Sequence, residues 1–208
     1  MPPLPLYDGD SVIETDPDQR LFTKRLTNRA VQFIENHKDE PFFLYVPHIM
    51  PHVPIFASDR FRGKSARGLY GDVIEEIDWS VGEIVKTIDR LSLTENTLVI
   101  FTNDNGPFLS YGTHAGQSGA LRGGKLTTFE GGVRVPMVAR WPGQIPAGHT
   151  CSTPIISIDF LPTFCHLAKA PLPRNTIDGI NIADVLEGKT NTVEGRDGLV
   201  FYAGSELQ

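Results

Sequence analysis

The hydrophobic positions of the chain repeat with two different periods. Near the start they recur every three to four residues, at Phe22, Leu26, Ala30, Phe33 and Ile34. This spacing predicts a helix that ends near Asn36. Its first turn is expected to have Asp16 as the N-cap, Pro17 at the first helical position and Gln19 reaching back to the cap.

Later apolar positions predict two further helices and three strands. The strongest amphipathic series covers residues 69–91, and a shorter one covers residues 158–168. Continuous apolar runs over residues 42–46, 97–102 and 135–139 are typical of strands that are buried on both faces. Strands that alternate with helices form βαβ units, so we expect an α/β fold with a mostly parallel sheet flanked by helices.

Length and composition restrict the class of protein. The 208 residues suffice for one domain with a core, in which residues 1–15 are expected to be an irregular, proline-rich lead-in and residues 16–202 the α/β core. The net charge of −6 argues against nucleic acid or an anionic membrane as a partner. No apolar run reaches the roughly 20 residues of a membrane span. The two cysteines, Cys151 and Cys165, provide neither a disulfide framework nor a zinc site.

Two unusual segments begin where predicted strands end. Residues 47–54, which contain His48 and His52, follow the first strand, and residues 103–107 follow the second. Ligands of open α/β sheets bind beyond the carboxyl ends of the strands. Both segments are therefore expected at the sheet edge that holds a ligand.

The second of these segments offers hard oxygen ligands. Asp104 and Asn105 each carry a side-chain oxygen, and Gly106 lets the chain turn sharply. Such oxygens suit Ca²⁺, and less well Mg²⁺, rather than zinc. The alternative is an Asx turn that caps the strand, because Asn-Asp-Asn-Gly is also strong turn chemistry.

A glycine-rich loop over residues 106–132 follows, and loops of this length are usually functional. Lys125 within it supplies a positive charge for an anion that a nearby cation also contacts; the alternative is a solvated surface lysine. His114, in the same loop, is a weaker candidate for substrate contact. His52, flanked by prolines, is suited to donate to an ester oxygen or to act as a general acid, although a lone loop histidine often has no such role.

Together these segments resemble the sulfatase family, in particular the arylsulfatase A-like branch of the alkaline-phosphatase-type hydrolases. The likeness runs in order from about residue 17 to residue 202. It is carried by residues 42–45, 51–54, 71–72, 76–78, 97–107, 123–136, 141–143, 158–163 and 178–179.

The resemblance implies a function and a role for each candidate. Asp104 and Asn105 look like the later pair of metal ligands in the family, normally to Ca²⁺. Lys125 is similar to the lysine that binds a sulfate oxygen, and His52 to the histidine that contacts the ester and assists the leaving group. The family hydrolyses sulfate esters of small molecules or glycans through a formylglycine hydrate. Most members are periplasmic, extracellular or lysosomal.

Part of the family pattern is missing. Formylglycine arises from Cys or Ser in a C-x-P-x-R pattern, which residues 151–155 do not match, and the early Asp-Asp metal pair is absent. The chain thus resembles the C-terminal portion of a sulfatase catalytic domain, incomplete at its N-terminal side, where the formylglycine is expected. Alone it is expected to be inactive and aggregation-prone. Two alternatives remain: a phosphate or phosphonate monoester hydrolase of the same superfamily, and a non-catalytic fragment that binds a sulfated ligand.

Overall fold

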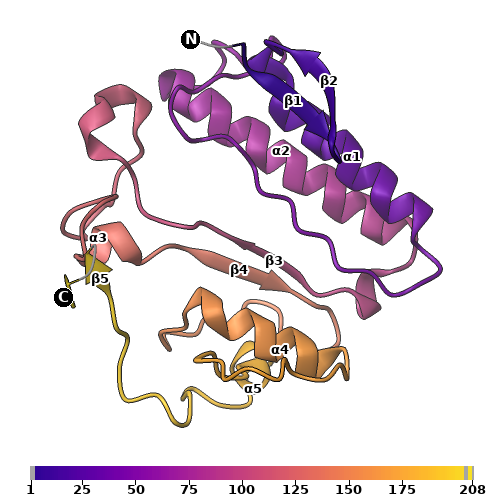
Figure 1. The fold of residues 1–208 in the computed structure, drawn as a ribbon, viewed down its shortest axis with the longest axis vertical. Helices are drawn as coiled ribbons and strands as arrows, with labels where there is room; N and C mark the ends of the chain where they lie inside the picture. Colours follow the sequence, from indigo (N-terminus) through magenta and orange to yellow (C-terminus); the bar gives the residue numbers. More distant parts are fainter. Residues whose placement is uncertain (1–2, 204–205, 208) are drawn as a thin grey trace. The chain divides into compact units, whose positions relative to one another are not determined.

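The computed structural model describes residues 3–203 and 206–207, which form two compact units. Unit 1 comprises residues 1–93 and 107–117, and unit 2 comprises residues 94–106 and 118–208. The chain therefore passes from one unit to the other three times along its length (Figure 1). No helix among the described residues is long and apolar enough to cross a membrane.

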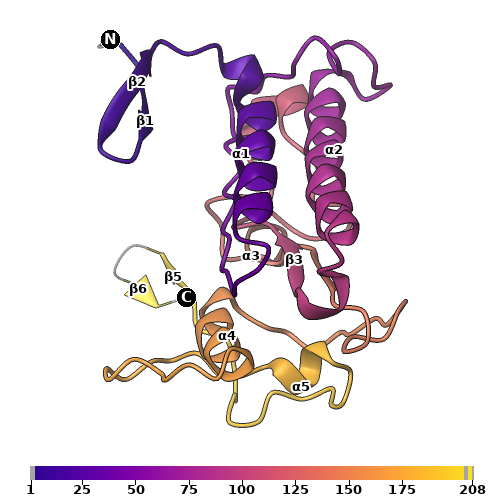
Figure 2. The same ribbon diagram turned by 90° about the vertical axis from the view of Figure 1, so that its right-hand side faces the viewer.

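Two long helices form the frame of unit 1. α1 (Phe22–Asn36) and α2 (Gly68–Arg90) lie side by side in both ribbon views (Figures 1 and 2). Both occupy the residues for which the apolar spacing predicts helices. The main apolar core of this unit lies between α2 and the segment before it, and it consists of Met50, Ile55, Ala57, Val73 and Ile77.

The start of the first helix differs from the prediction. A 3-10 turn, η1 (Gln19–Leu21), precedes α1, and Asp18 caps it by accepting the backbone N–H of Arg20 at 3.0 Å. Asp16 instead has a φ of 51° and bonds to Leu4 through both its backbone N–H and its carboxylate. The predicted Asp16 cap is wrong because the contact with Leu4, distant in sequence, outweighs the local capping pattern.

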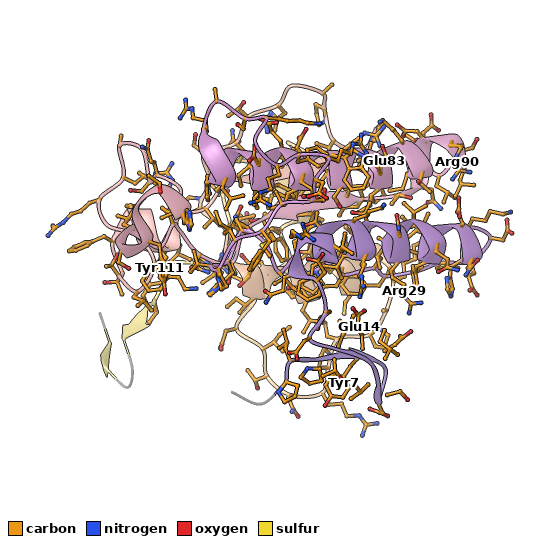
Figure 3. All side chains as sticks on the ribbon, turned by 90° about the horizontal axis from the view of Figure 1, so that it is seen from above. Tyr7, Glu14, Arg29, Glu83, Arg90 and Tyr111 are labelled. Atoms are coloured by element: carbon orange, nitrogen blue, oxygen red, sulfur yellow. The ribbon has the colours of Figure 1, made fainter. Side chains whose placement is uncertain are left out.

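The described part of the first 15 residues forms a hairpin. β1 (Pro5–Asp8) pairs antiparallel with β2 (Ser11–Thr15). Two ion pairs link the hairpin to α1, namely Arg25–Glu14 and Arg29–Asp8. Figure 3 labels one residue of each pair, Glu14 on the hairpin and Arg29 on the helix. The predicted irregular lead-in is therefore wrong, since a proline at the first position of an edge strand leaves the ladder intact.

Residues 42–46 are extended but have no strand pairing in the described part of the chain. Their side chains alternate in exposure: Phe43 is 69% and Tyr45 75% exposed, whereas Phe42 is half-buried. The ring of Phe42 contacts Phe33 of α1, with centroids 5.9 Å apart. The predicted strand buried on both faces is wrong, because Phe43 and Tyr45 on one face of the segment are largely exposed to solvent.

The sheet of unit 2 is an antiparallel pair. β3 (Val99–Thr102) pairs with β4 (Met137–Arg140), and Thr102 lies opposite Met137. The parallel arrangement expected for these two strands is wrong. The connection between them contains only two short helices, η3 (Leu109–His114) and α3 (Glu130–Val133). A parallel pair needs a crossover to the opposite end of the strand, whereas this connection returns to the end that it left.

The remainder of unit 2 is built from short elements. η2 (Thr94–Asn96) precedes β3, and η4 (Ser157–Asp159) leads into α4 (Phe160–Leu167), so the helix predicted over residues 158–168 is confirmed apart from its first turn. α5 (Ala183–Leu186) contributes Val185 and Leu186 to a core cluster that also contains Ile182. A short antiparallel pair, β5 (Tyr202–Ala203) and β6 (Glu206–Leu207), follows.

Asp159, at the start of α4, has no exposed surface. Its carboxylate accepts the backbone N–H groups of Ile156 and Ile180, each at 3.0 Å, and forms a two-pronged ion pair with Arg196. Burial raises the pKa of Asp159, but the hydrogen bonds from Arg196 and the two amides outweigh burial and hold the pKa below its usual value. One side chain thereby ties three separate stretches of sequence together.

Candidate functional site

The predicted oxygen ligands lie directly after β3. Asp104 is exposed and Asn105 is half-buried. Within the described residues, neither side chain forms a hydrogen bond, so the capping contact that defines an Asx turn is not made there. Thr102, at the end of the strand, donates its hydroxyl to the Pro136 carbonyl at 3.1 Å. The strand end is thus fixed while the oxygens of Asp104 and Asn105 remain available to a ligand.

Four glycines fix the strand end against the loop that carries Lys125. The Gly106 N–H donates to the Gly132 carbonyl at 2.9 Å. A Cβ on Gly106 would lie 1.8 Å from the Gly131 oxygen, and a Cβ on Gly131 would lie 2.2 Å from the Gly123 oxygen. No side chain fits such distances, because real Cβ contacts are never shorter than about 3 Å. The two backbones therefore touch directly.

The backbone around Lys125 is bent into a tight turn. Gly131 donates to the Arg122 carbonyl at 2.8 Å, and the Thr127 hydroxyl donates to the Gly124 carbonyl at 2.7 Å. The Arg122 guanidinium lies 3.7 Å from the centroid of the Phe129 ring. Lys125 itself is half-buried. Its position along this turn is consequently set by backbone hydrogen bonds on both sides.

His52 lies in unit 1, on the segment that packs against α2. Its imidazole is exposed, and Nδ1 lies 2.8 Å from the Val53 carbonyl oxygen. A carbonyl only accepts, so Nδ1 carries the proton and the outward Nε2 is the lone-pair nitrogen of the neutral ring. The end of the segment is held where Ser58 N–H donates to the buried Glu76 carboxylate at 2.8 Å. His52 thus has a defined tautomer on an anchored loop.

Several buried polar residues lie next to this loop, and the sequence offers no reason to predict most of them as part of the site. The Thr27 and Ser80 hydroxyls form a hydrogen bond of 2.6 Å between α1 and α2, and His48 Nε2 lies 3.4 Å from Ser80 Oγ. His48 Nδ1 and the second oxygen of Glu76 are buried and have no hydrogen-bond partner among residues 3–203 and 206–207. Burial lowers the pKa of His48. The only sequence signal for Glu76 is its place in a segment that resembles the sulfatases.

The candidates divide between the two units. His114 is exposed at the end of η3 and lies with His52 in unit 1, whereas Asp104, Asn105 and Lys125 lie in unit 2. Within unit 2 the strand end and the lysine turn share one backbone framework. The described residues contain no group of three or more His, Cys, Asp or Glu side chains that could hold a metal. Two oxygen ligands fit Ca²⁺ by type, but they supply a minority of the six to eight ligands it takes.

The α/β framework of the chain is shared with solved sulfatases and with a solved phosphonate monoester hydrolase. The solved phosphonate monoester hydrolase from Silicibacter pomeroyi shares this fold with a TM-score of 0.65 at 19% identity, and covers 88% of the chain. The α/β fold class is confirmed by this likeness and by solved sulfatases. The family model described as Sulfatase matches residues 5–170. The chain therefore belongs to the sulfatase family.

Named relatives agree with this assignment. Human steryl-sulfatase is 44% identical over 174 residues, which is 81% of this chain and 30% of that protein. Human arylsulfatase A is 46% identical over 165 residues, which is 79% of this chain and 32% of that protein. The solved structure of Ps i-CgsB in complex with k-i-k-neocarrahexaose has a TM-score of 0.78 at 35% identity, covering 90% of this chain and 42% of that one. The chain spans about a third of the length of these curated relatives.

Proposed function

We propose that these residues form part of the active site of a sulfuric ester hydrolase. The observation that carries the proposal is the glycine contact in unit 2, where Gly106 and Gly132 join the end of β3 to the turn that bears Lys125. This contact leaves the oxygens of Asp104 and Asn105 uncommitted. The membership of the sulfatase family supports a sulfate ester as the substrate.

Each side chain has a role in this proposal. Asp104 and Asn105 would hold a Ca²⁺ ion, which when bound neutralises charge on the non-bridging oxygens of the ester. Lys125 contributes an ammonium group, with three donors, to one sulfate oxygen. His52 would donate from Nε2 to the ester or leaving oxygen as the imidazolium, because the Nδ1 proton is engaged by the Val53 carbonyl and Nε2 needs a proton of its own to donate. His114 is a secondary substrate contact.

The nucleophile is not among these residues. No Cys or Ser in the sequence stands in the C-x-P-x-R pattern, so no step is assigned to formylglycine here. We expect the 208-residue chain to show no turnover of an aryl sulfate with Ca²⁺ present. Hydrolysis by this chain that disappears on Lys125→Ala would contradict that expectation. Reading the source gene upstream of Met1 gives a second test: an Asp-Asp pair followed by C-x-P-x-R supports the hydrolase, and an immediate upstream terminator contradicts it.

The proposed Ca²⁺ half-site, which consists of Asp104 and Asn105, can be tested in the 208-residue chain itself. Calorimetric titration should detect weak Ca²⁺ binding, with a dissociation constant on the order of 1 mM, because few ligands are present. Asp104→Ala should abolish that binding, whereas Asp197→Ala, which removes an exposed carboxylate elsewhere in unit 2, should leave it unchanged. Equal Ca²⁺ binding by both variants would refute the assignment of Asp104.

The choice between sulfate and phosphate esters needs a substrate pair. A longer product of the source gene should hydrolyse an aryl sulfate faster than the matching aryl phosphate or phosphonate ester. A preference for the phosphorus esters would favour the second kind of hydrolase, with which the chain shares the fold. Binding of sulfated ligand without turnover of either ester would leave a non-catalytic binding role.

A further inference from the structure

The loop between the His52 segment and α2 concentrates positive charge in an acidic chain. Four exposed cations, Arg60, Arg62, Lys64 and Arg67, lie within eight residues, although the chain has a net charge of −6. The single acidic residue of the loop, Asp59, pairs with Arg20 at 3.4 Å. None of the four cations forms an ion pair within the described residues, whereas Arg25, Arg29 and Arg90 in the same unit do.

The backbone of this basic loop, residues 58–67, is held in place by carboxylates of α2. The buried carboxylate of Asp72 accepts three successive N–H groups, from Gly63 at 2.7 Å, Lys64 at 3.0 Å and Ser65 at 2.8 Å. Glu76, one turn along α2, accepts the N–H of Ser58. Both carboxylates are directed at amides of the loop. A loop that is already ordered loses little entropy when it binds a partner.

Arg60 has a further constraint. Its guanidinium lies 5.1 Å from the Phe61 ring centroid and 4.9 Å from that of Trp79, and the two rings are 5.8 Å apart. Stacking occupies the face of a guanidinium and leaves its in-plane N–H groups for an anion. Those groups form a fork that suits sulfate, phosphate and carboxylate oxygens. Arg60 is thereby oriented without being neutralised.

We propose that the basic loop is a docking surface for a sulfated polysaccharide. This inference rests on the proposed function, since sulfate-ester hydrolysis is what makes a sulfated glycan the polyanion this chain would meet. The groove between α1 and α2 is a poorer place for an anion, because Glu35 and Glu83 line it. Duplex DNA is the competing polyanion, and binding to it is one outcome of the test.

The test measures binding of the 208-residue chain to dextran sulfate, with unsulfated dextran, carboxymethyl dextran and duplex DNA as comparison ligands. The triple variant Arg62→Gln, Lys64→Gln, Arg67→Gln should bind dextran sulfate about tenfold or more weakly, and its salt-dependence slope should fall by roughly two. These side chains are exposed and form no ion pair within the described part of the chain, so the fold should be retained, and circular dichroism is the check. Arg60→Lys, which keeps the charge without the fork, should weaken binding less than Arg60→Gln.

A matched control removes the same amount of charge from unit 1. The variant Lys24→Gln, Lys38→Gln, Lys86→Gln alters three exposed lysines outside the loop, of which Lys38 and Lys86 are in exposed ion pairs, and should stay within about threefold of the parent chain. Equal losses in the two triple variants would overturn the proposal, as would equal affinity for DNA or for carboxymethyl dextran. So would absence of binding to dextran sulfate.

The outcomes separate this inference from the proposed function. If Asp104 binds Ca²⁺ but the loop variant binds dextran sulfate normally, the docking surface is refuted and the half-site stands. If the loop variant loses binding but Asp104→Ala leaves Ca²⁺ binding intact, the assigned half-site is refuted instead. Lys125→Ala should not alter docking, because Lys125 lies outside the basic loop.

Discussion

The ion pair between Asp159 and Arg196 should dominate the stability of unit 2. The substitution Asp159→Asn keeps the shape of the side chain but leaves the Arg196 guanidinium without its counter-charge. Breaking a buried ion pair costs about 3–5 kcal/mol. Arg196 keeps 10% of its surface exposed, which allows some rehydration, so the lower end of that range applies. We expect the free energy of unfolding to fall by about 3 kcal/mol, a large share of a typical total of 5–15 kcal/mol.

Urea unfolding followed by circular dichroism measures this loss. The matched control is Asp184→Asn, the same chemical change in an exposed pair: Asp184 and Lys189 are 71% and 65% exposed. It should cost less than about 0.5 kcal/mol. Hydrogen exchange gives a local measure, because the amides of Ile156 and Ile180 donate to the Asp159 carboxylate and should exchange faster in the variant. A loss no larger than in the control would refute the reasoning.

The pH dependence of the same pair has a defined sign. Burial raises the pKa of Asp159, yet Arg196 and the amides lower it by more, so the folded pKa lies below the unfolded value near 3.9. Stability from such a group is present above the unfolded pKa and is lost as the pH falls through the folded pKa. The difference between the parent chain and Asp159→Asn should therefore be full at pH 7 and shrink below about pH 4.

Three further predictions concern the site and its supports. Gly106→Ala places a Cβ 1.8 Å from the Gly131 oxygen and should abolish Ca²⁺ binding in a calorimetric titration. The comparison variant Gly82→Ala lies in α2 with open space around it, and it should raise the free energy of unfolding by up to about 1 kcal/mol. Asp72→Asn leaves one side-chain acceptor oxygen for three amides, so the Gly63, Lys64 and Ser65 amides should exchange faster, while the exposed change Asp78→Asn should not alter them. Burial lowers the pKa of His48, so the stability that its neutral ring contributes is present above about pH 6.5 and is lost as the pH falls. The urea midpoint of the parent chain should therefore decline between pH 7 and pH 5, and His48→Gln should make that decline smaller. An unchanged decline in the variant would contradict this prediction.

The helices of the chain could be predicted because their information is local. The apolar spacing from Phe22 to Ile34, and again through α2, marks one face of a helix whatever the rest of the chain does. Strand partners are not local information. The run 42–46 has the composition of a buried strand, but pairing depends on segments elsewhere, and the antiparallel order of β3 and β4 follows from the absence of a crossover helix.

The candidate site was predictable where chemistry coincides with a strand end. Asp104, Asn105 and Gly106 could be singled out on that basis, and the glycine loop drew attention to Lys125. The buried residues that hold the site and its framework in place could not be found in the same way. Glu76 and Ser80 occupy helix positions that resemble ordinary polar ones, and only the fold shows that they are buried and contact the loop bearing His52. The Asp159–Arg196 pair joins residues 37 positions apart, which no local pattern specifies.

The extended segment 42–46 has a consequence for the colloidal behaviour of the chain. Its exposed Phe43 and Tyr45, with no charge in the run, resemble the segments that stack into fibrils. A stacked segment grows through continuous backbone amides over at least about six residues. Proline has no amide hydrogen, and Pro41 and Pro47 stand at the two ends of this run. The prolines therefore act as gatekeepers: residues 42–46 can pair with a single incoming strand, yet the run is too short to template a fibril.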